Sequence, residues 1–384
     1  MTRCCVLLTL AGPLGILSRA TITTYLKAIM DPHDTTLPRL ECLSSDLLRY
    51  EYLKLARNNT KTTNTEIQYF FALDLRQVLP LLPRLLGSLV EAIRFLGPEQ
   101  CALSIISGNF PDGTDEVLAD LGPQLEALPT TYYFHSSQVN PKEGDRIAKL
   151  AELRNLALQP LRTETEHQRY TVNTTVIFLN DVAICLEDIL ELVHQRQFQK
   201  ADMVCAMDWV YVGQDPTFYD IWVARTLDGD SFFEIPPDGN WNSAWNIFWN
   251  NPPTRSRYDA HLPFQVFSCW NGATVFTAAP ILGSQISFRP PREGECVQGE
   301  PQLFCKDLWY HGYRRIAVVP SVNLEYSDER GRQIKDLKGY TSRWAGNVDS
   351  KAEAIEWRQN PPNKVKCMGT YANQFWQAWN ETLP

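Results

Sequence analysis

The sequence predicts an α/β fold built on a doubly wound, mostly parallel sheet. Between residues 67 and 207, short apolar runs alternate with stretches of helical periodicity, which is the pattern of successive βαβ units. Of the 384 residues, 44% are hydrophobic and 21% are charged, as in a folded globular chain with a sizeable core. The formal charge of −8 argues against a broad basic surface, so we expect no nucleic-acid partner.

The first predicted units follow a polar lead-in. Residues 68–73 form an aromatic and apolar run that ends at Asp74, and residues 78–96 have helical spacing with prolines only in the first turn. A second strand, at 101–106, breaks at a loop dense in turn residues, 107–114. The order is therefore strand, helix, strand.

The alternation continues through the middle of the chain. We expect a helix at 115–128, a strand at 131–135 and a helix at 145–161. A fourth apolar run, at 176–179, ends in an Asn-Asp pair and precedes a helix over 186–193. These elements extend the same parallel arrangement.

Two further strands complete the predicted sheet. Residues 201–207 form an apolar run that ends at Asp208, and residues 219–226 form another. The second run is closed by Leu227-Asp-Gly-Asp230, which has the composition of a turn.

We expect the chain to have three parts. Residues 1–64 are a lead-in, residues 65–325 the α/β domain, and residues 326–384 a C-terminal extension packed on that domain. Residues 4–17 are apolar but shorter than the about 20 residues that a spanning helix needs, so they suit a secretory signal, a weak membrane anchor or a buried segment. A secretory or a cytosolic location is compatible with this pattern.

The cysteines and sequons give little guidance on location. Ten cysteines form no Cys-x-x-Cys pair, and only Cys296 and Cys305 lie close together in a polar stretch, where they could form a disulfide clip or, less often, a zinc site. Asn-x-Ser/Thr sequons occur at Asn58, Asn173 and Asn380, and they are compatible with the secretory pathway.

Acidic residues end three of the predicted strands: Asp74, Asp181 and Asp208. In open α/β sheets, ligands bind outside the carboxyl ends of the strands. Carboxylates that lie beside phosphate-binding loops are suited to hold a divalent cation, and such a cation can bridge two phosphate groups. The sequence therefore predicts a nucleotide-sugar site, and the alternative for Asp181 is a helix N-cap.

Common nucleotide and hydrolase motifs are missing from the sequence. There is no P-loop, no Gly-x-Gly-x-x-Gly and no Gly-x-Ser-x-Gly. Asp228-Gly-Asp230 matches the Asp-x-Asp metal motif of many glycosyltransferases in letters, but its surroundings favour a hairpin turn. Asp181, at the end of a buried strand, is the better candidate for a metal ligand.

Several blocks of sequence carry a family resemblance. They include Phe70-Phe-Ala-Leu-Asp-Leu75, Ala201-Asp-Met-Val-Cys-Ala-Met-Asp-Trp209, Phe218-Tyr-Asp-Ile-Trp-Val-Ala-Arg225, Cys269-Trp-Asn-Gly272 and Pro301-Gln-Leu-Phe-Cys-Lys-Asp-Leu-Trp309. In this order they resemble the fungal capsule-associated (cryptococcal-type) α-1,3-mannosyltransferase family. The resemblance implies a GT-A type fold, a GDP-mannose donor and a glycan or small-molecule acceptor. It also implies a divalent cation such as manganese and an α-1,3 linkage formed with retention of configuration. It further implies a location in the Golgi.

The resemblance also implies roles for individual residues. The nucleotide-sugar would contact Leu73, Asp74, Asn109, Asp112, Arg154 and Asn180; the metal would contact Asp181 and His311; and Asp208, Asp220 and Glu300 would act in catalysis. The alternatives are a surface ion pair for Arg154, ordinary caps or turns for Asp208 and Asp220, and a structural role for His311.

Two other functions are compatible with the sequence. The same fold could use another nucleotide sugar or a small-metabolite acceptor. A catalytically silent carbohydrate-binding protein could instead use the tryptophans at 241, 245 and 249, whose four-residue spacing otherwise predicts a core stripe.

Overall fold

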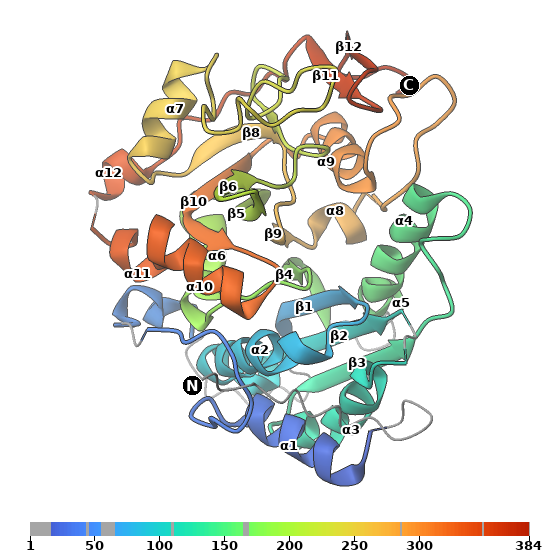
Figure 1. The fold of residues 1–384 in the computed structure, drawn as a ribbon, viewed down its shortest axis with the longest axis vertical. Coiled ribbons are helices and arrows are strands. Elements are labelled where there is room, and N and C mark those ends of the chain that lie inside the picture. The colour runs from blue at the N-terminus through green and yellow to red at the C-terminus, as the bar shows by residue number, and fades with distance from the viewer. Residues whose placement is uncertain are drawn as a thin grey trace, which may run out of the picture.

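The fold is built around one long central sheet with helices on both faces (Figure 1). The computed structural model describes residues 17–43, 46–54, 66–108, 111–163, 169–284, 286–347 and 349–383. The strand order is β3-β2-β1-β4-β9-β5-β10-β8-β7, with β6 paired to β5. The strands are β1 (Ile67–Leu75), β2 (Cys101–Ser107), β3 (Thr131–Ser136), β4 (Tyr170–Leu179), β5 (Met203–Val212), β6 (Asp215–Phe218), β7 (Arg225–Thr226), β8 (Phe264–Ser268), β9 (Ala273–Thr277) and β10 (Ile316–Leu324). The predicted α/β class is confirmed.

The sheet is parallel from β3 through β4 and mixed beyond it. Strand β9 runs antiparallel to both of its neighbours, β4 and β5, while β5 and β10 are parallel to each other. The start of β9 therefore lies at the same edge as the carboxyl ends of β4, β5 and β10. This edge gathers the polar residues described below.

Strand β1 shows why these runs form central strands. Phe71 and Leu73 are buried in the core on one face of the sheet, whereas Phe70 and Ala72 are buried in the core on the other face. Apolar residues at every position, rather than at alternate ones, are typical of a strand covered on both sides.

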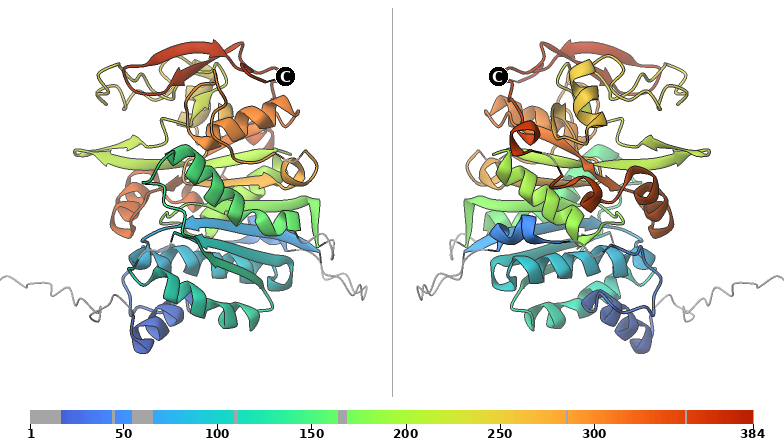
Figure 2. Two further views of the ribbon diagram at one scale, coloured as in Figure 1. Left: turned by 90° about the vertical axis from the view of Figure 1, so that its right-hand side faces the viewer. Right: turned by 90° about the vertical axis from the view of Figure 1, so that its left-hand side faces the viewer.

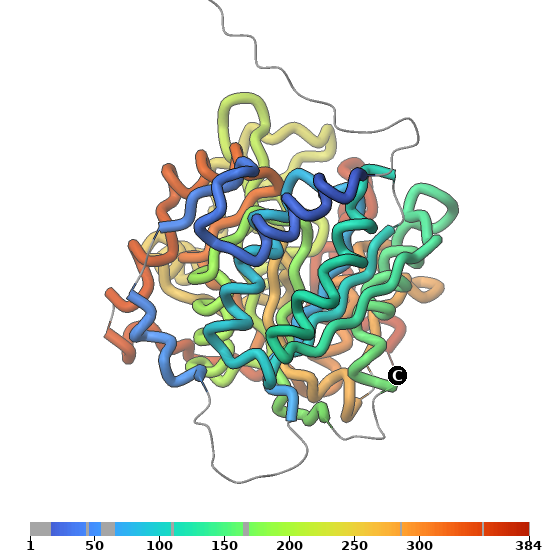
Figure 3. Tube along the Cα trace, turned by 90° about the horizontal axis from the view of Figure 1, so that it is seen from below, coloured from blue at the N-terminus to red at the C-terminus, as the bar shows by residue number. Residues whose placement is uncertain are grey.

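Helices cover both faces, as Figure 2 shows with the sheet seen from its edges. Helices α2 and α6 pack together on one face, and α1 lies against α2 and α3. Helix α4 lies on the other face against β1 and β2, and it contacts α9. Seen from below in Figure 3, α1, α2 and α3 form the outer layer of the N-terminal part. The longer helices are α1 (Arg19–Met30), α2 (Leu82–Leu96), α3 (Thr114–Glu126), α4 (Arg146–Ala157), α6 (Leu186–Phe198), α7 (Pro252–Asp259), α9 (Glu300–Tyr310) and α10 (Asp328–Lys338).

Short helices and a hairpin complete the fold. The hairpin of β11 (Lys364–Met368) and β12 (Gln374–Ala378) lies at the opposite end of the molecule from α1 (Figure 1). The short helices are η1 (Leu48–Leu53), η2 (Leu79–Leu81), η3 (Pro98–Gln100), α5 (Gln159–Thr163), α8 (Ala279–Leu282), α11 (Thr341–Trp344) and α12 (Ser350–Glu353). Among the described helices, none is long and apolar enough to cross a membrane.

The prediction of one strand over 219–226 was wrong. The chain instead turns at residues 219–224, between β6 and β7, and the Ala224 N–H donates to the Asp220 carbonyl as in a helical turn. The Asp220 carboxylate accepts the backbone N–H of Asn271. A tertiary contact thus holds this segment out of the extended conformation that its residues favour.

Cys296 and Cys305, which could have formed a disulfide clip or a zinc site, do not pair with each other. Cys296 is bonded to Cys367, and Cys305 is a free, buried thiol. The other disulfides are Cys42–Cys185 and Cys205–Cys269. All three join segments more than 60 residues apart, so their pairing depends on the tertiary fold.

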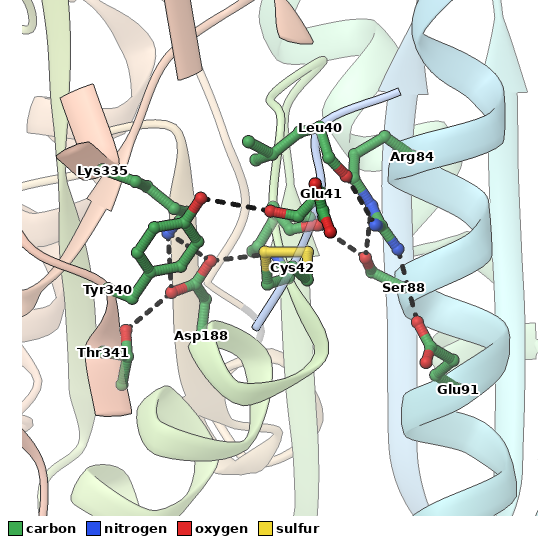
Figure 4. The surroundings of a disulfide bond; sticks show 12 residues. Leu40, Glu41, Cys42, Arg84, Ser88, Glu91, Asp188, Lys335, Tyr340 and Thr341 are labelled. Atoms are coloured by element: carbon green, nitrogen blue, oxygen red, sulfur yellow. Dashed lines mark hydrogen bonds and ion pairs between the residues drawn. A yellow bond between two sulfur atoms is a disulfide. The ribbon is translucent and has the colours of Figure 1, made fainter. Parts of the chain in front are cut away.

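A buried ion pair lies near the Cys42–Cys185 disulfide (Figure 4). Lys335 of α10 donates to both carboxylate oxygens of Asp188 at 2.7 and 2.9 Å, and each residue is 1% exposed. Thr341 and the Cys185 backbone N–H also donate to Asp188. This network joins α6 to the segment that follows β10.

Lys335→Met should lower the free energy of unfolding by about 3–5 kcal/mol, because it leaves the Asp188 charge buried without its cation. Urea denaturation measures the effect. The matched control is Lys149→Met, which breaks an exposed pair with Glu152 and should cost less than about 1 kcal/mol. Equal effects of the two changes would contradict the prediction.

Candidate active site

Polar residues from four strands meet at one edge of the sheet. Asp74 lies near the end of β1, Asp181 follows β4, and Asp208 lies in β5 opposite Leu324 of β10. Tyr326 follows β10, and its hydroxyl donates to the Asp208 carboxylate at 2.6 Å. The predicted edge therefore carries acids from β1, β4 and β5.

Two connections bring Asp220 to the same edge. Strand β6 turns back antiparallel to β5, and the Tyr219 N–H donates to the Asp208 carbonyl. The turn before β9 then supplies the Asn271 N–H to Asp220 at 2.9 Å. Gly272 has a φ of +77°, and a Cβ there would lie 3.0 Å from Val182, so the close approach of this turn requires glycine.

A pocket of about 510 Å³ opens beside these residues. Its polar lining includes Arg154, Asn180, Asp220, Glu300 and Tyr326. Aromatic rings contribute much of the remaining lining: Tyr219, Trp222, Trp241, Trp270 and Tyr371. A pocket with aromatic sides and a few convergent charged groups is typical of a small-molecule site.

Arg154 is the cation at the centre of this arrangement. It projects from α4, is 9% exposed, and donates through Nε to Glu300 at 2.7 Å. Its guanidinium lies over the Trp270 ring at 4.5 Å, and a terminal nitrogen makes a 3.5 Å contact with Asn180. The surface ion pair considered for Arg154 is excluded, because the pair with Glu300 is buried.

Several carboxyl groups lie around the Arg154 guanidinium, and Arg146 also lines the pocket. Burial raises the pKa of Asp74 to about 7, while Arg154 opposes that rise and Glu300 and Asp181 add to it. Burial also raises the pKa of Asp220 to about 6 and raises the pKa of Asp181. The acids therefore outnumber the arginines near them, and a further positive charge would favour their ionised forms.

Asp208 is the least exposed of the acids at this site. It is 1% exposed, and its Oδ1 atom has no hydrogen-bond partner among the described residues. Burial, together with the charge of Asp220, raises the pKa of Asp208 well above its usual value. Asp208 and Asp220 thus behave as a coupled pair in which the second ionisation is unfavourable.

Asp74→Asn should stabilise the ligand-free protein at pH 8, by on the order of 4 kcal/mol. The native state holds the Asp74 proton up to about pH 7, above the unfolded value near 4, so this acid lowers stability as the pH rises through that window. Urea denaturation at pH 5 and pH 8 measures the effect, and the gain should be larger at pH 8. A gain of the same size at both values would contradict the assignment.

The acidic residues at the sheet edge are chemically suited to bind a divalent cation. Carboxylate oxygens are the ligands that Mg²⁺ and Mn²⁺ favour, and the carboxylates of Asp74 and Asp181 accept no hydrogen bond from another described residue. The N-cap alternative for Asp181 is excluded, because Cys185 occupies that position in α6.

A tighter cluster of metal-type ligands lies elsewhere. Ligand atoms of Glu191, His194 and Glu353 lie within 4.8 Å of one another, and this is the one such cluster found in the described parts of the chain. Arg49 donates to both carboxylates, so its guanidinium already supplies the positive charge. We interpret the cluster as an ion-pair network that joins η1, α6 and α12.

Three of the predicted site residues that the structure describes lie away from the pocket, whereas Asp74, Asp181 and Asp208 lie beside its lining rather than in it. The Leu73 side chain is fully buried in the core, and the Asp112 carboxylate accepts from Thr114 and from the Leu79 N–H as a turn residue. His311 is exposed at the C-terminal end of α9, whereas Glu300 starts that helix at the pocket. Asn109 lies outside the described residues.

The Asp-x-Asp sequence is a turn, as its surroundings predict. Gly229 has a φ of +85°, and its position would place a Cβ 2.2 Å from the Lys364 carbonyl oxygen. Asp228 accepts from Asn251, and Asp230 pairs with Lys366. Asp230 therefore stabilises the contact with β11, and both acids lie outside the pocket lining.

Several pocket residues were missed by the sequence analysis. Tyr326 and Tyr371 lie in the low-periodicity C-terminal part, which offers no motif. Trp222 lies in the segment predicted as a strand. The tryptophans at 241, 245 and 249 do not form a helical stripe, since Trp241 lines the pocket while Trp245 is 77% exposed. The sequence feature that could have indicated an aromatic pocket was the excess of aromatic residues between positions 209 and 270.

Comparisons with known proteins agree on a class of enzyme. A family model described as "Cryptococcal mannosyltransferase 1" matches residues 68–307. The alpha-1,3-mannosyltransferase CMT1 of Cryptococcus neoformans is 35% identical over 316 residues, which is 78% of this chain and 67% of that protein. The protein is therefore a glycosyltransferase. It belongs to the cryptococcal mannosyltransferase 1 family.

Solved structures give more distant matches. Mannosyltransferase PcManGT from Pyrobaculum calidifontis, in complex with GDP-Man and Mn²⁺, is 12% identical, with a TM-score of 0.41 over 83% of this chain and 70% of that one. TarS 1-349 from S. aureus is 13% identical, with a TM-score of 0.39 over 74% of this chain and 68% of that one.

Proposed function

We propose that the protein transfers mannose from GDP-mannose to a sugar hydroxyl, in an α-1,3 linkage and with retention of configuration. Membership of the cryptococcal mannosyltransferase 1 family supports the transferred sugar, and the name of the Cryptococcus relative supports the linkage. The observation that carries the proposal is the set of partly buried acids around Arg154, at the sheet edge where α/β proteins bind ligands.

Arg154 would hold the donor diphosphate. A guanidinium can contact two phosphate oxygens at once, and Nε is already fixed by Glu300, so the terminal nitrogens remain to bind the anion. The buried position of Arg154 strengthens this attraction, because little solvent screens the charge.

Asp181, with Asp74 beside it, would hold a divalent cation such as Mn²⁺. When bound, such a cation stabilises the charge that develops on a leaving diphosphate. The leaving diphosphate could itself accept the proton of the acceptor hydroxyl, so transfer with retention requires no separate strong base. Asp220 and Glu300 line the pocket and would orient donor or acceptor hydroxyls.

A secretory location is part of the proposal. Three disulfides join distant segments of the described chain, and disulfides persist in oxidising compartments. The sequons at Asn173 and Asn380 have exposed asparagines, so both positions could carry a glycan in the folded protein.

Calorimetry with GDP, with and without Mn²⁺, tests the site. We expect GDP binding to strengthen at least about tenfold with the metal, since the acids need a cation beside the diphosphate. A donor panel with mass detection tests the sugar, and GDP-mannose should be hydrolysed or transferred while UDP-sugars are not. Activity with UDP-sugars alone would overturn the donor. Absence of metal-linked nucleotide binding would favour a carbohydrate-binding protein without catalysis.

A further inference from the structure

The pocket has two chemically different sides. Asp220, Glu300, Arg154 and Asn180 form the charged and polar side, where the proposed donor diphosphate would bind. The other side presents three aromatic rings, from Trp222, Trp241 and Tyr371, which we name the aromatic wall. The proposed function uses the first side and leaves the second without a ligand.

The aromatic wall is held by contacts from several segments. The rings of Trp222 and Tyr371 lie 4.9 Å apart, and both are partly exposed to the pocket. Gly239, at a φ of +71°, allows close packing, because a Cβ there would lie 2.6 Å from the Tyr371 ring. The Gln374 side chain donates to the Tyr371 carbonyl at 2.7 Å, which fixes the backbone behind the ring.

A disulfide ties both sides of the pocket together. Cys296 precedes the segment 297–301, which includes Glu300, and Cys367 precedes Met368, Gly369 and Tyr371. The Cys296–Cys367 bond therefore keeps the C-terminal part of the wall beside the charged side. Gln298 adds a second link, since its side chain donates to the Trp222 carbonyl at 3.1 Å.

The residues of the two sides of the pocket come from different parts of the chain. All the acids and Arg154 lie within residues 68–307, the part that matches the family model, whereas Tyr371 lies beyond it. The charged side of the pocket therefore lies within the part of the chain that matches the family model. The C-terminal part of the aromatic wall is added by a segment outside that match.

We propose that the aromatic wall is the subsite for a pyranose ring of the acceptor glycan, and that the disulfide-held segment at Tyr371 helps to select the acceptor. This inference rests on the proposed function. Aromatic faces provide broad apolar contacts for the C–H groups of a sugar ring, and they offer little to a diphosphate. A pyranose on the wall would lie beside Asp220 and Glu300, where an acceptor hydroxyl must arrive.

Saturation-transfer NMR tests the subsite, with methyl α-mannopyranoside as probe and GDP and Mg²⁺ present. We expect saturation of the sugar C–H protons in the wild type, and binding at least about tenfold weaker in Tyr371→Ala and Trp222→Ala. Tyr371→Phe keeps the ring and should retain binding. Trp376→Ala is the matched control, because Trp376 is in the same hairpin, is 46% exposed and lies outside the pocket lining.

The outcomes separate this inference from the proposed function. GDP affinity, measured by calorimetry on the same variants, should change less than about twofold, because the proposal assigns the wall to the acceptor and not to the nucleotide. Unchanged sugar binding in both alanine variants would overturn the subsite, as would absence of saturation in the wild type. Loss of GDP binding in Tyr371→Ala would instead assign the wall to the donor. Failure of the wild type to bind GDP would overturn the proposed function separately.

Discussion

Asp181→Ala should reduce mannose transfer at least about 100-fold while leaving the protein folded, because a lost metal ligand removes stabilisation of the leaving diphosphate but no core packing. The Asp181 carboxylate follows β4 and accepts no hydrogen bond from another described residue, so its removal breaks no structural contact of that kind. Initial rates with GDP-mannose measure the loss, and circular dichroism with thermal unfolding checks the fold.

Asp228→Ala is the matched control for this prediction. Asp228 belongs to the Asp-x-Asp sequence, but its carboxylate contacts Asn251 and Arg358 outside the pocket lining. We expect activity within about twofold of the wild type, since a surface carboxylate of this kind contributes little. Near-normal turnover by Asp181→Ala, or a large loss in Asp228→Ala, would reverse the assignment of the metal ligand.

Arg154→Ala should lower kcat/KM about 100- to 1000-fold, since a buried guanidinium that binds the diphosphate would be lost. It should also destabilise the protein, because Glu300 is 2% exposed and would remain without its 2.7 Å partner. Steady-state kinetics and urea denaturation measure the two effects.

The double variant Arg154→Ala/Glu300→Gln separates these effects. Glu300→Gln removes the unpaired charge, so we expect most of the lost stability to return while activity stays low. Recovery of activity together with stability would mean that Arg154 acts only by neutralising Glu300. That result would remove Arg154 from the proposed diphosphate site.

The arrangement of the predicted acids followed from local rules. Asp74, Asp181 and Asp208 each come at or near the end of an apolar run, and the carboxyl ends of such strands meet at one edge. The same reasoning correctly identified Asp228-Gly-Asp230 as a turn, because a glycine between apolar runs readily adopts the left-handed conformation that Gly229 has here.

The remaining parts of the site depend on contacts between distant segments. Asp220 reaches the edge because β6 folds back on β5 and Asn271 donates to its carboxylate, although its own residues favour a strand. Tyr371 reaches the pocket because Cys367 pairs with Cys296, 71 positions away. Neither contact has a local sequence signal.

The sequence by itself determined the strands and helices between residues 67 and 207 and the edge to which their acids belong, because hydrophobic periodicity and turn chemistry act over a few residues. The tertiary structure alone decided which acids surround Arg154, which cysteines pair and which aromatic rings line the pocket. Those choices depend on how segments far apart in the sequence pack, and on the burial that shifts the pKa values of the acids once they are packed.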